Sequence, residues 1–129
     1  MAHIRFVQKG DVDDCAVAIT VSRHAVHRYA GRGGSHISPA AMEREIKKCI
    51  LDAMDSGMLV NVGRNTHLAP LKAKDVIKSF AVLKVAGPVE KPFAITVCTV
   101  ITAEMAINSF AFATGLMHML ARPEVLPVL

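Results

Sequence analysis

The sequence predicts one α+β domain: a small antiparallel-type sheet, two helices from the N-terminal half on one side of it, and a long apolar C-terminal helix. Three observations lead to this fold class. The chain has 129 residues, 52% of them hydrophobic, which suits one core and leaves little room for a second domain. Short β-branched runs occur in both halves, and apolar residues between them repeat at helical spacing. We therefore treat residues 1–129 as one domain, with residues 103–122 as a helical extension.

The composition limits the classes of partner and compartment. Fifteen Lys and Arg residues stand against eleven Asp and Glu residues, giving a net charge of +4. This mild basicity is compatible with a nucleic acid or an acidic protein as partner, without requiring either. The three cysteines are widely spaced and form no CxxC pair, which argues against a zinc knuckle or a disulfide framework. The N-terminal segment lacks an apolar signal core, so we expect a cytoplasmic protein.

The first third of the chain is expected to form two strands and a helix. Ile4–Gln8 and Val17–Val21 are the strands, the second of them rich in β-branched residues. Ser22 follows as a good N-cap, because its hydroxyl can accept a hydrogen bond from an amide of the first turn. The helix then runs until glycines stop it at Gly31, Gly33 and Gly34.

The second helix is the most clearly marked element of the first half. Ser38 and Pro39 form a strong start signal, a capping side chain followed by proline at the first helical position. Gly57 ends the helix. Between these limits the apolar residues repeat at helical spacing: Met42, Ile46, Cys49, Ile50, Ala53 and Met54.

The middle of the chain is less clearly patterned. Met58–Val62 is expected to form a strand, and residues 63–66 a turn. Residues 67–79 are ambiguous, because Pro70 disfavours a helix before it while the residues after it fit either a short helix or an edge strand. Phe80–Val85 and Phe93–Ile101 are convincing strands. The second has apolar side chains on both faces, so we expect both faces to be covered.

The C-terminal helix is expected to run from Ala103 to about Ala121 and to end at Arg122 and Pro123. A membrane span needs about 20 strongly apolar residues, and polar residues interrupt this run: Asn108, Ser109, Thr114, Gly115 and His118. We therefore expect no membrane span. The helix would instead pack against the sheet or form the seam of a homo-oligomer.

One face of the first helix concentrates basic and imidazole side chains. At roughly 100° per residue, His24, His27 and Arg28 share this face, with Arg32 near them. The opposite face is suited to a core and consists of Ala25, Val26, Tyr29 and Ala30.

This polar face is equipped for a phosphate-bearing partner. Arginine donates two hydrogen bonds at once to phosphate, and imidazole can transfer a proton near neutral pH. The alternative is a solvated basic face that pairs with Glu43, Glu45 or the cluster at residues 11–14. A metal site could be built from His24 and His27 and completed by His67 or a carboxylate. An H-x-x-H pair without a Glu or Cys partner is a frequent accident, so we expect neither a metal nor a cofactor.

The order of these signals resembles that of a known family. A strand leads into Ser-x-His-Ala-x-x-Arg-x-x-x-Arg-Gly, carried by Ser22, His24, Ala25, Arg28, Arg32 and Gly33. A Pro-started helix over residues 37–53 and strands over residues 80–102 follow. This order is similar to that of small RelE-like ribonuclease toxins, in particular the BrnT-type group and related phage-borne or mobile-element proteins. The resemblance spans about residues 17–102. It implies a small sheet with two helices on one side, metal-independent RNA cleavage, and a tightly bound antitoxin.

The resemblance places His24, Arg28 and Arg32 in an active region, with His27 as an extra imidazole. We expect catalysis by His24, His27 and Arg28, and substrate binding by Arg23, Arg32 and Arg64. Two features depart from the family pattern, a long segment over residues 63–79 and the apolar helix after Thr102. Fold does not determine function, so two hypotheses stand: a metal-independent endoribonuclease of a toxin or mobile-element type, or a non-enzymatic phage-type inhibitor or interaction protein that oligomerises through Ala103–Ala121.

Overall fold

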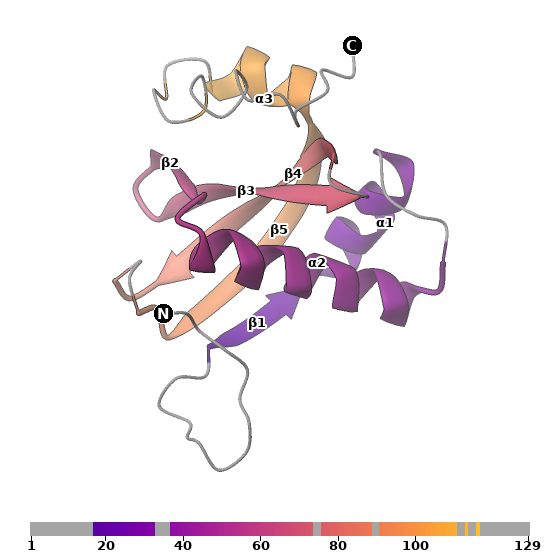
Figure 1. Cartoon of the computed structure of the whole chain (residues 1–129), viewed down its shortest axis with the longest axis horizontal. Coiled ribbons are helices and arrows are strands. Elements are labelled where there is room, and N and C mark those ends of the chain that lie inside the picture. Colours follow the sequence, from indigo (N-terminus) through magenta and orange to yellow (C-terminus); the bar gives the residue numbers. More distant parts are fainter. Residues whose placement is uncertain are drawn as a thin grey trace.

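The computed structural model describes residues 17–32, 37–73, 76–88, 91–110, 113 and 116 of the chain. Three helices and five strands make up this part (Figure 1). In chain order they are β1 (Ala18–Val21), α1 (Arg23–Gly31), α2 (Pro39–Asp55), β2 (Val60–Gly63), β3 (Thr66–Ala73), β4 (Val76–Ala86), β5 (Ala94–Thr102) and α3 (Ala103–Phe110). The α+β class is confirmed. The strand expected over Ile4–Gln8 lies outside the described residues.

The strands form one mixed sheet, in the order β1-β5-β4-β3-β2. β1 runs parallel to β5, and the other three neighbouring pairs are antiparallel. The expectation of a purely antiparallel sheet is therefore wrong at one edge. Two helices and three strands separate β1 from β5 along the chain, so no tight hairpin forces this pair to be antiparallel.

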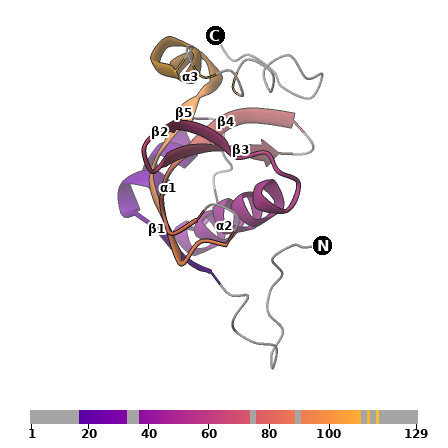
Figure 2. The ribbon, with the colours of Figure 1, turned by 90° about the vertical axis from the view of Figure 1, so that its left-hand side faces the viewer.

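Helices lie on both sides of the curved sheet. α2 lies inside its curve and packs against β3 and β1, whereas α3 lies outside it and packs against β4 and β5 (Figure 2). α1 packs along β5 and beside α2. Ser79, Phe80 and Ala81 of β4 are consecutive and all buried. Because consecutive side chains of a strand point to opposite faces, both faces of β4 are covered here. In β5, the strand for which the sequence led us to expect this, Val100 and Ile101 are both buried but Thr96 is exposed, so both faces are covered only near its end.

The ambiguous segment after residue 66 forms strand rather than helix. β3 contains Pro70, and β2 pairs with β3 only as far as Leu68. Beyond Leu68, β3 therefore has no partner strand on the β2 side among the described residues. Pro70 lies in this part, so its missing N–H removes no hydrogen bond on that side. Gly57 has a positive φ of 70° and ends α2, as expected from the sequence.

The expected long C-terminal helix is not confirmed. α3 ends at Phe110 in the described chain, and the hydrogen bonds that follow join residues three apart, from Ala113 N–H to the Phe110 carbonyl and from Leu116 N–H to the Ala113 carbonyl. Ala113 and Leu116 are buried; the other residues from 111 to 121 lie outside the described part. None of the described helices has the length and apolar character needed to cross a bilayer.

Candidate functional site

Helix α1 begins at a serine that both caps it and joins it to the sheet. Ser22 has an extended backbone, with φ −70° and ψ 157°, and its Oγ accepts a hydrogen bond from Ala25 N–H at 3.0 Å. The same hydroxyl donates to the carbonyl of Cys98 on β5 at 3.2 Å, and Ser22 N–H donates to the Val97 carbonyl at 3.2 Å. The predicted N-cap is confirmed, and its position is fixed by β5.

An irregularity in β5 places the sheet edge under α1. β4 pairs Val82 with Thr99 but Leu83 with Val97, so Cys98 is an extra residue in β5. Such a bulge bends a strand and redirects its backbone groups. β1 pairs with β5 only as far as Val97. Beyond that point, α1 packs along β5 in place of β1. At the start of the helix, the Ser22 hydroxyl donates a hydrogen bond to the Cys98 carbonyl.

Arg32 makes the second attachment, at the end of α1. Its Nη1 donates to the Val100 carbonyl at 3.0 Å. We expected Arg32 to bind substrate, but part of its hydrogen-bonding capacity holds the helix to β5. A guanidinium has five N–H donors, and this contact uses one of them. Both ends of α1 are thus attached to the same strand, which keeps the helix in a fixed orientation.

The apolar face of α1 is buried as the sequence indicates. Ala25 and Tyr29 are 0% and 3% exposed, and Val26 and Ala30 pack against the same core. Tyr29 Oη donates to Glu45 Oε1 of α2 at 2.7 Å. Burial, together with the hydrogen bond and the charge of Glu45, raises the pKa of Tyr29 well above its usual value. Tyr29 is therefore a neutral donor that links α1 to α2.

The opposite face of α1 is open to solvent. Arg23, His24 and His27 are exposed, and Arg28 and Arg32 are half-buried. His27, Arg28 and Arg32 line an open hollow together with Ala30 and Gly31. His24 lies one helical turn before His27 and Arg28, on the same side. The structure thus places an imidazole and two guanidiniums around one depression, with a second imidazole next to it.

The acidic residues proposed to neutralise this face have other contacts. Glu43 pairs with Lys47 of its own helix at 3.1 Å, and Glu45 accepts the Tyr29 hydroxyl. Residues 11–14 lie outside the described part. Within the described residues, no ion pair involves His24, His27 or Arg28. No acidic side chain of the described residues therefore competes with a ligand for these three groups.

Two residues named from the sequence lie away from α1. Arg64 is exposed in the turn between β2 and β3, at the opposite edge of the sheet from β1. His67 is on β3, where it is 8% exposed and contacts Asn61 of β2. The structure therefore separates Arg64 and His67 from the α1 face. Among the described residues, no three His, Cys, Asp or Glu side chains are grouped so that they could hold a metal ion.

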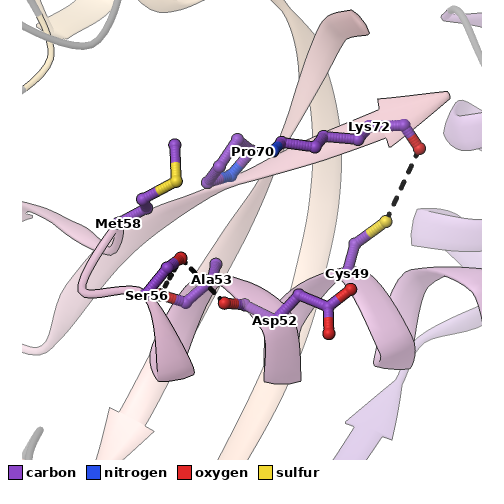
Figure 3. A pocket seen from close by; sticks show the side chains of 7 residues that line it. All are labelled: Cys49, Asp52, Ala53, Ser56, Met58, Pro70 and Lys72. Atoms are coloured by element: carbon purple, nitrogen blue, oxygen red, sulfur yellow. Dashed lines mark hydrogen bonds between the residues drawn. The ribbon is translucent and has the colours of Figure 1, made fainter. Parts of the chain in front are cut away.

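A second hollow lies between α2 and β3. Seven residues line it, and they are Cys49, Asp52, Ala53, Ser56, Met58, Pro70 and Lys72 (Figure 3). The Cys49 thiol is 3.7 Å from the Lys72 carbonyl, which it faces across this hollow. Burial raises the pKa of the Cys49 thiol, although the Lys72 backbone opposes this. A protonated thiol is a poor nucleophile, so this hollow offers less chemistry than the α1 face.

Sequence reasoning missed the contacts that depend on distant partners. Ser22 and Arg32 bind carbonyls 76 and 68 residues away, and the Tyr29 hydroxyl reaches a different helix. Among the contacts described above, the one between Asn61 and His67 has a local signal in the sequence, because the two residues lie on either side of a Gly-containing turn.

No family model, no curated protein and no solved structure matches this chain. The geometry of the α1 face is therefore the basis for a functional proposal.

Proposed function

We propose that this protein is an RNA-binding endoribonuclease that acts without a metal ion, with its site on the solvent face of α1. The observation that carries the proposal is the hollow lined by His27, Arg28 and Arg32. It combines two guanidiniums, which suit a phosphate, with a side chain that can exchange protons near neutral pH. The helix is attached to β5 at both ends, so these groups are presented in a fixed arrangement.

The chemistry requires one proton acceptor and one proton donor. In RNA cleavage without a metal, the 2′-hydroxyl oxygen attacks the adjacent phosphorus after a base removes its proton. An acid then protonates the departing 5′ oxygen, which leaves a 2′,3′-cyclic phosphate and a 5′-hydroxyl. His24 and His27 are three residues apart on one helical face, where Cβ atoms lie about 5–6 Å apart, and they supply the two proton-transfer groups.

The arginines bind the charge that develops on the phosphate. Arg28 has no ion pair within the described part of the chain and is the main phosphate ligand. Arg32 contributes donors that its Val100 contact leaves available. Arg23, exposed at the start of α1, extends the positive surface along the RNA backbone. Arg64 lies at the opposite sheet edge, so we do not include it in the site.

Cleavage of an end-labelled single-stranded RNA in excess EDTA tests the proposal. We expect the wild type to produce 2′,3′-cyclic phosphate ends and to leave DNA of the same sequence intact, because DNA lacks the 2′-hydroxyl. His24→Gln, His27→Gln and Arg28→Met should each reduce the rate strongly. Arg44→Gln, at an exposed arginine of α2, is the matched control. The proposal fails if the wild type does not cleave, or if the α1 variants cleave as the wild type does.

The non-enzymatic alternative depends on the C-terminal segment. An interaction protein that oligomerises through residues 103–121 needs an apolar surface there. Ala103, Ala106 and Leu116 are instead buried within their own chain. These three side chains therefore give the alternative no support, whereas the α1 proposal has the described hollow behind it. Light scattering of the purified protein tests the alternative, which would be supported by a stable oligomer that lacks RNA cleavage.

For the endoribonuclease, the partners we propose are RNA and, for regulation, an antitoxin-like protein.

A further inference from the structure

The β2–β3 hairpin contains a chain of polar contacts that determines which ring nitrogen of His67 carries a proton. Gly63 N–H donates to Asn61 Oδ1 at 3.2 Å. Asn61 Nδ2 lies 3.3 Å from His67 Nε2, and the two residues are direct partners across the hairpin. Because Oδ1 is used by Gly63, the amide presents its NH₂ to the ring. Nε2 must therefore accept, and the proton of the neutral ring is on Nδ1.

The surroundings of the ring oppose a second proton. His67 is 8% exposed, and its Nδ1 is buried without a hydrogen-bond partner of good geometry. This burial lowers the pKa of His67. The Asn65 backbone lies close enough to oppose the shift, but it is the smaller influence. A charge at this position would be poorly solvated, and none of the described residues forms an ion pair with the ring.

The charged groups on the neighbouring elements point elsewhere. β2 has no titratable residue. On β4, the direct partner of His67 is Leu83, and Lys84 reaches Thr66 Oγ1 at 3.0 Å. The turn residue Arg64 is exposed. On α2, Cys49 and Asp52 line a hollow together with Pro70 and Lys72 of β3, and these two β3 residues lie further along the strand than His67. None of these groups offers the ring a compensating negative charge.

We propose that the Asn61–His67 contact is a pH-sensitive latch, which holds β2 on β3 while the ring is neutral and releases it when Nε2 is protonated. A proton on Nε2 would face the Asn61 NH₂, so the two donors would oppose each other. If the amide turned over to present its oxygen, its NH₂ would face Gly63 N–H instead. One hydrogen bond is lost in either arrangement, either the part-buried Asn61–His67 bond or the exposed Gly63–Asn61 bond.

β2 is the element that such a loss would release. It has four residues and lies at the sheet edge, and its register with β3 shifts between Asn61 and Gly63. Short edge strands open at low free-energy cost compared with central strands. Opening would uncover the edge of β3. The inference does not depend on the proposed RNA cleavage.

The direction of the pH effect follows from the lowered pKa. Above about pH 6.5, the ordinary histidine value, the ring is neutral in both the closed and the open hairpin, and the latch is fully effective. As the pH falls below this value, the open hairpin takes up the proton first. The closing equilibrium then weakens by up to about 10-fold per pH unit, until the closed form is also protonated.

Amide hydrogen exchange followed by NMR between pH 7.5 and pH 5 tests the latch in the full chain. Protection factors, corrected for intrinsic exchange, should fall for the β2 and β3 amides on acidification and stay constant in the β4–β5 ladder. His67→Gln should abolish this pH dependence. Asn61→Asp should reverse it, because a carboxylate accepts from both Gly63 N–H and a protonated Nε2. His24→Gln, which removes an exposed histidine, should keep the wild-type pH dependence of hairpin protection.

Three results would each overturn the latch. The first is hairpin protection that does not change with pH in the wild type. The second is a His67→Gln variant that is as acid-sensitive as the wild type, since the effect would then have another source. The third is an Asn61→Asp variant that opens in acid with the wild-type sign, because burial alone would then explain the response.

Discussion

Helix α1 and the β2–β3 hairpin both contain histidine, in opposite surroundings. On α1, His24 and His27 are exposed on a helix that is hydrogen-bonded to β5 through Ser22 and to α2 through Tyr29. In the hairpin, His67 is buried against an amide that requires it to be neutral. We propose proton transfer to a ligand for the first region and structural closure for the second. The surroundings of the histidine, and not its identity, separate the two roles.

The largest expected effect is on RNA cleavage. His24→Gln and His27→Gln should each lower the rate about 10²–10⁴-fold, the usual contribution of a proton-transfer group. His67→Gln should leave the rate near that of the wild type at pH 7.5, because that ring is outside the α1 face. Initial rates with one labelled RNA measure all three variants. If His67→Gln lost as much activity as the others, the separation of the two regions would be wrong.

The next effect concerns the contact that holds α1 to α2. Tyr29→Phe keeps the ring but leaves Glu45 without the hydroxyl donor seen at 2.7 Å. A hydrogen bond to a charged group contributes about 1.5–3 kcal/mol, so the free energy of unfolding should fall by about that amount. Urea denaturation followed by circular dichroism measures it. Replacing both residues, with Tyr29→Phe and Glu45→Leu, should cost less than the sum of the single changes.

The sequence predicted the local features of α1 well. A serine before an amphipathic run predicts a cap, and Ala25 and Tyr29 fall on the core face by helical periodicity alone. Those features depend on residues three or four apart. The start of α2 at Ser38 and Pro39 and its end at Gly57 are local in the same sense.

The features that sequence reasoning missed depend on pairing between distant segments. The parallel pairing of β1 with β5 and the extra residue at Cys98 cannot be read from either strand separately. The same holds for Arg64, whose charge suggested a place in the site, although strand order puts it at the other sheet edge. His67 differs from these cases, because its partner Asn61 lies only six residues away and a Gly-containing turn between them gives a local signal of their pairing.

A smaller effect is expected at the start of α1. Ser22→Ala removes the cap to Ala25 N–H and the donor to the Cys98 carbonyl, which should cost about 0.5–2 kcal/mol of stability. Thermal and urea denaturation measure this loss. Ser38→Ala is the matched control, because Ser38 caps α2 through Ala41 N–H in an exposed position. Ser22→Ala should be the more damaging of the two, and equal losses would show that the contact with β5 contributes little.

The smallest expected effect is the dependence of global stability on mild acid. Because burial lowers the pKa of His67, the unfolded chain binds the proton more readily, so the contribution of this residue is complete above about pH 6.5 and declines as the pH falls. Between pH 7 and pH 6 one such group lowers the free energy of unfolding by at most about 0.7 kcal/mol. Urea titrations at the two pH values, on the wild type and on His67→Gln, measure the difference. The variant should lose this part of the pH dependence, whereas His24→Gln retains His67 and should keep it. If His24→Gln flattened the dependence and His67→Gln did not, the roles assigned to the exposed and the buried histidine would have to be exchanged.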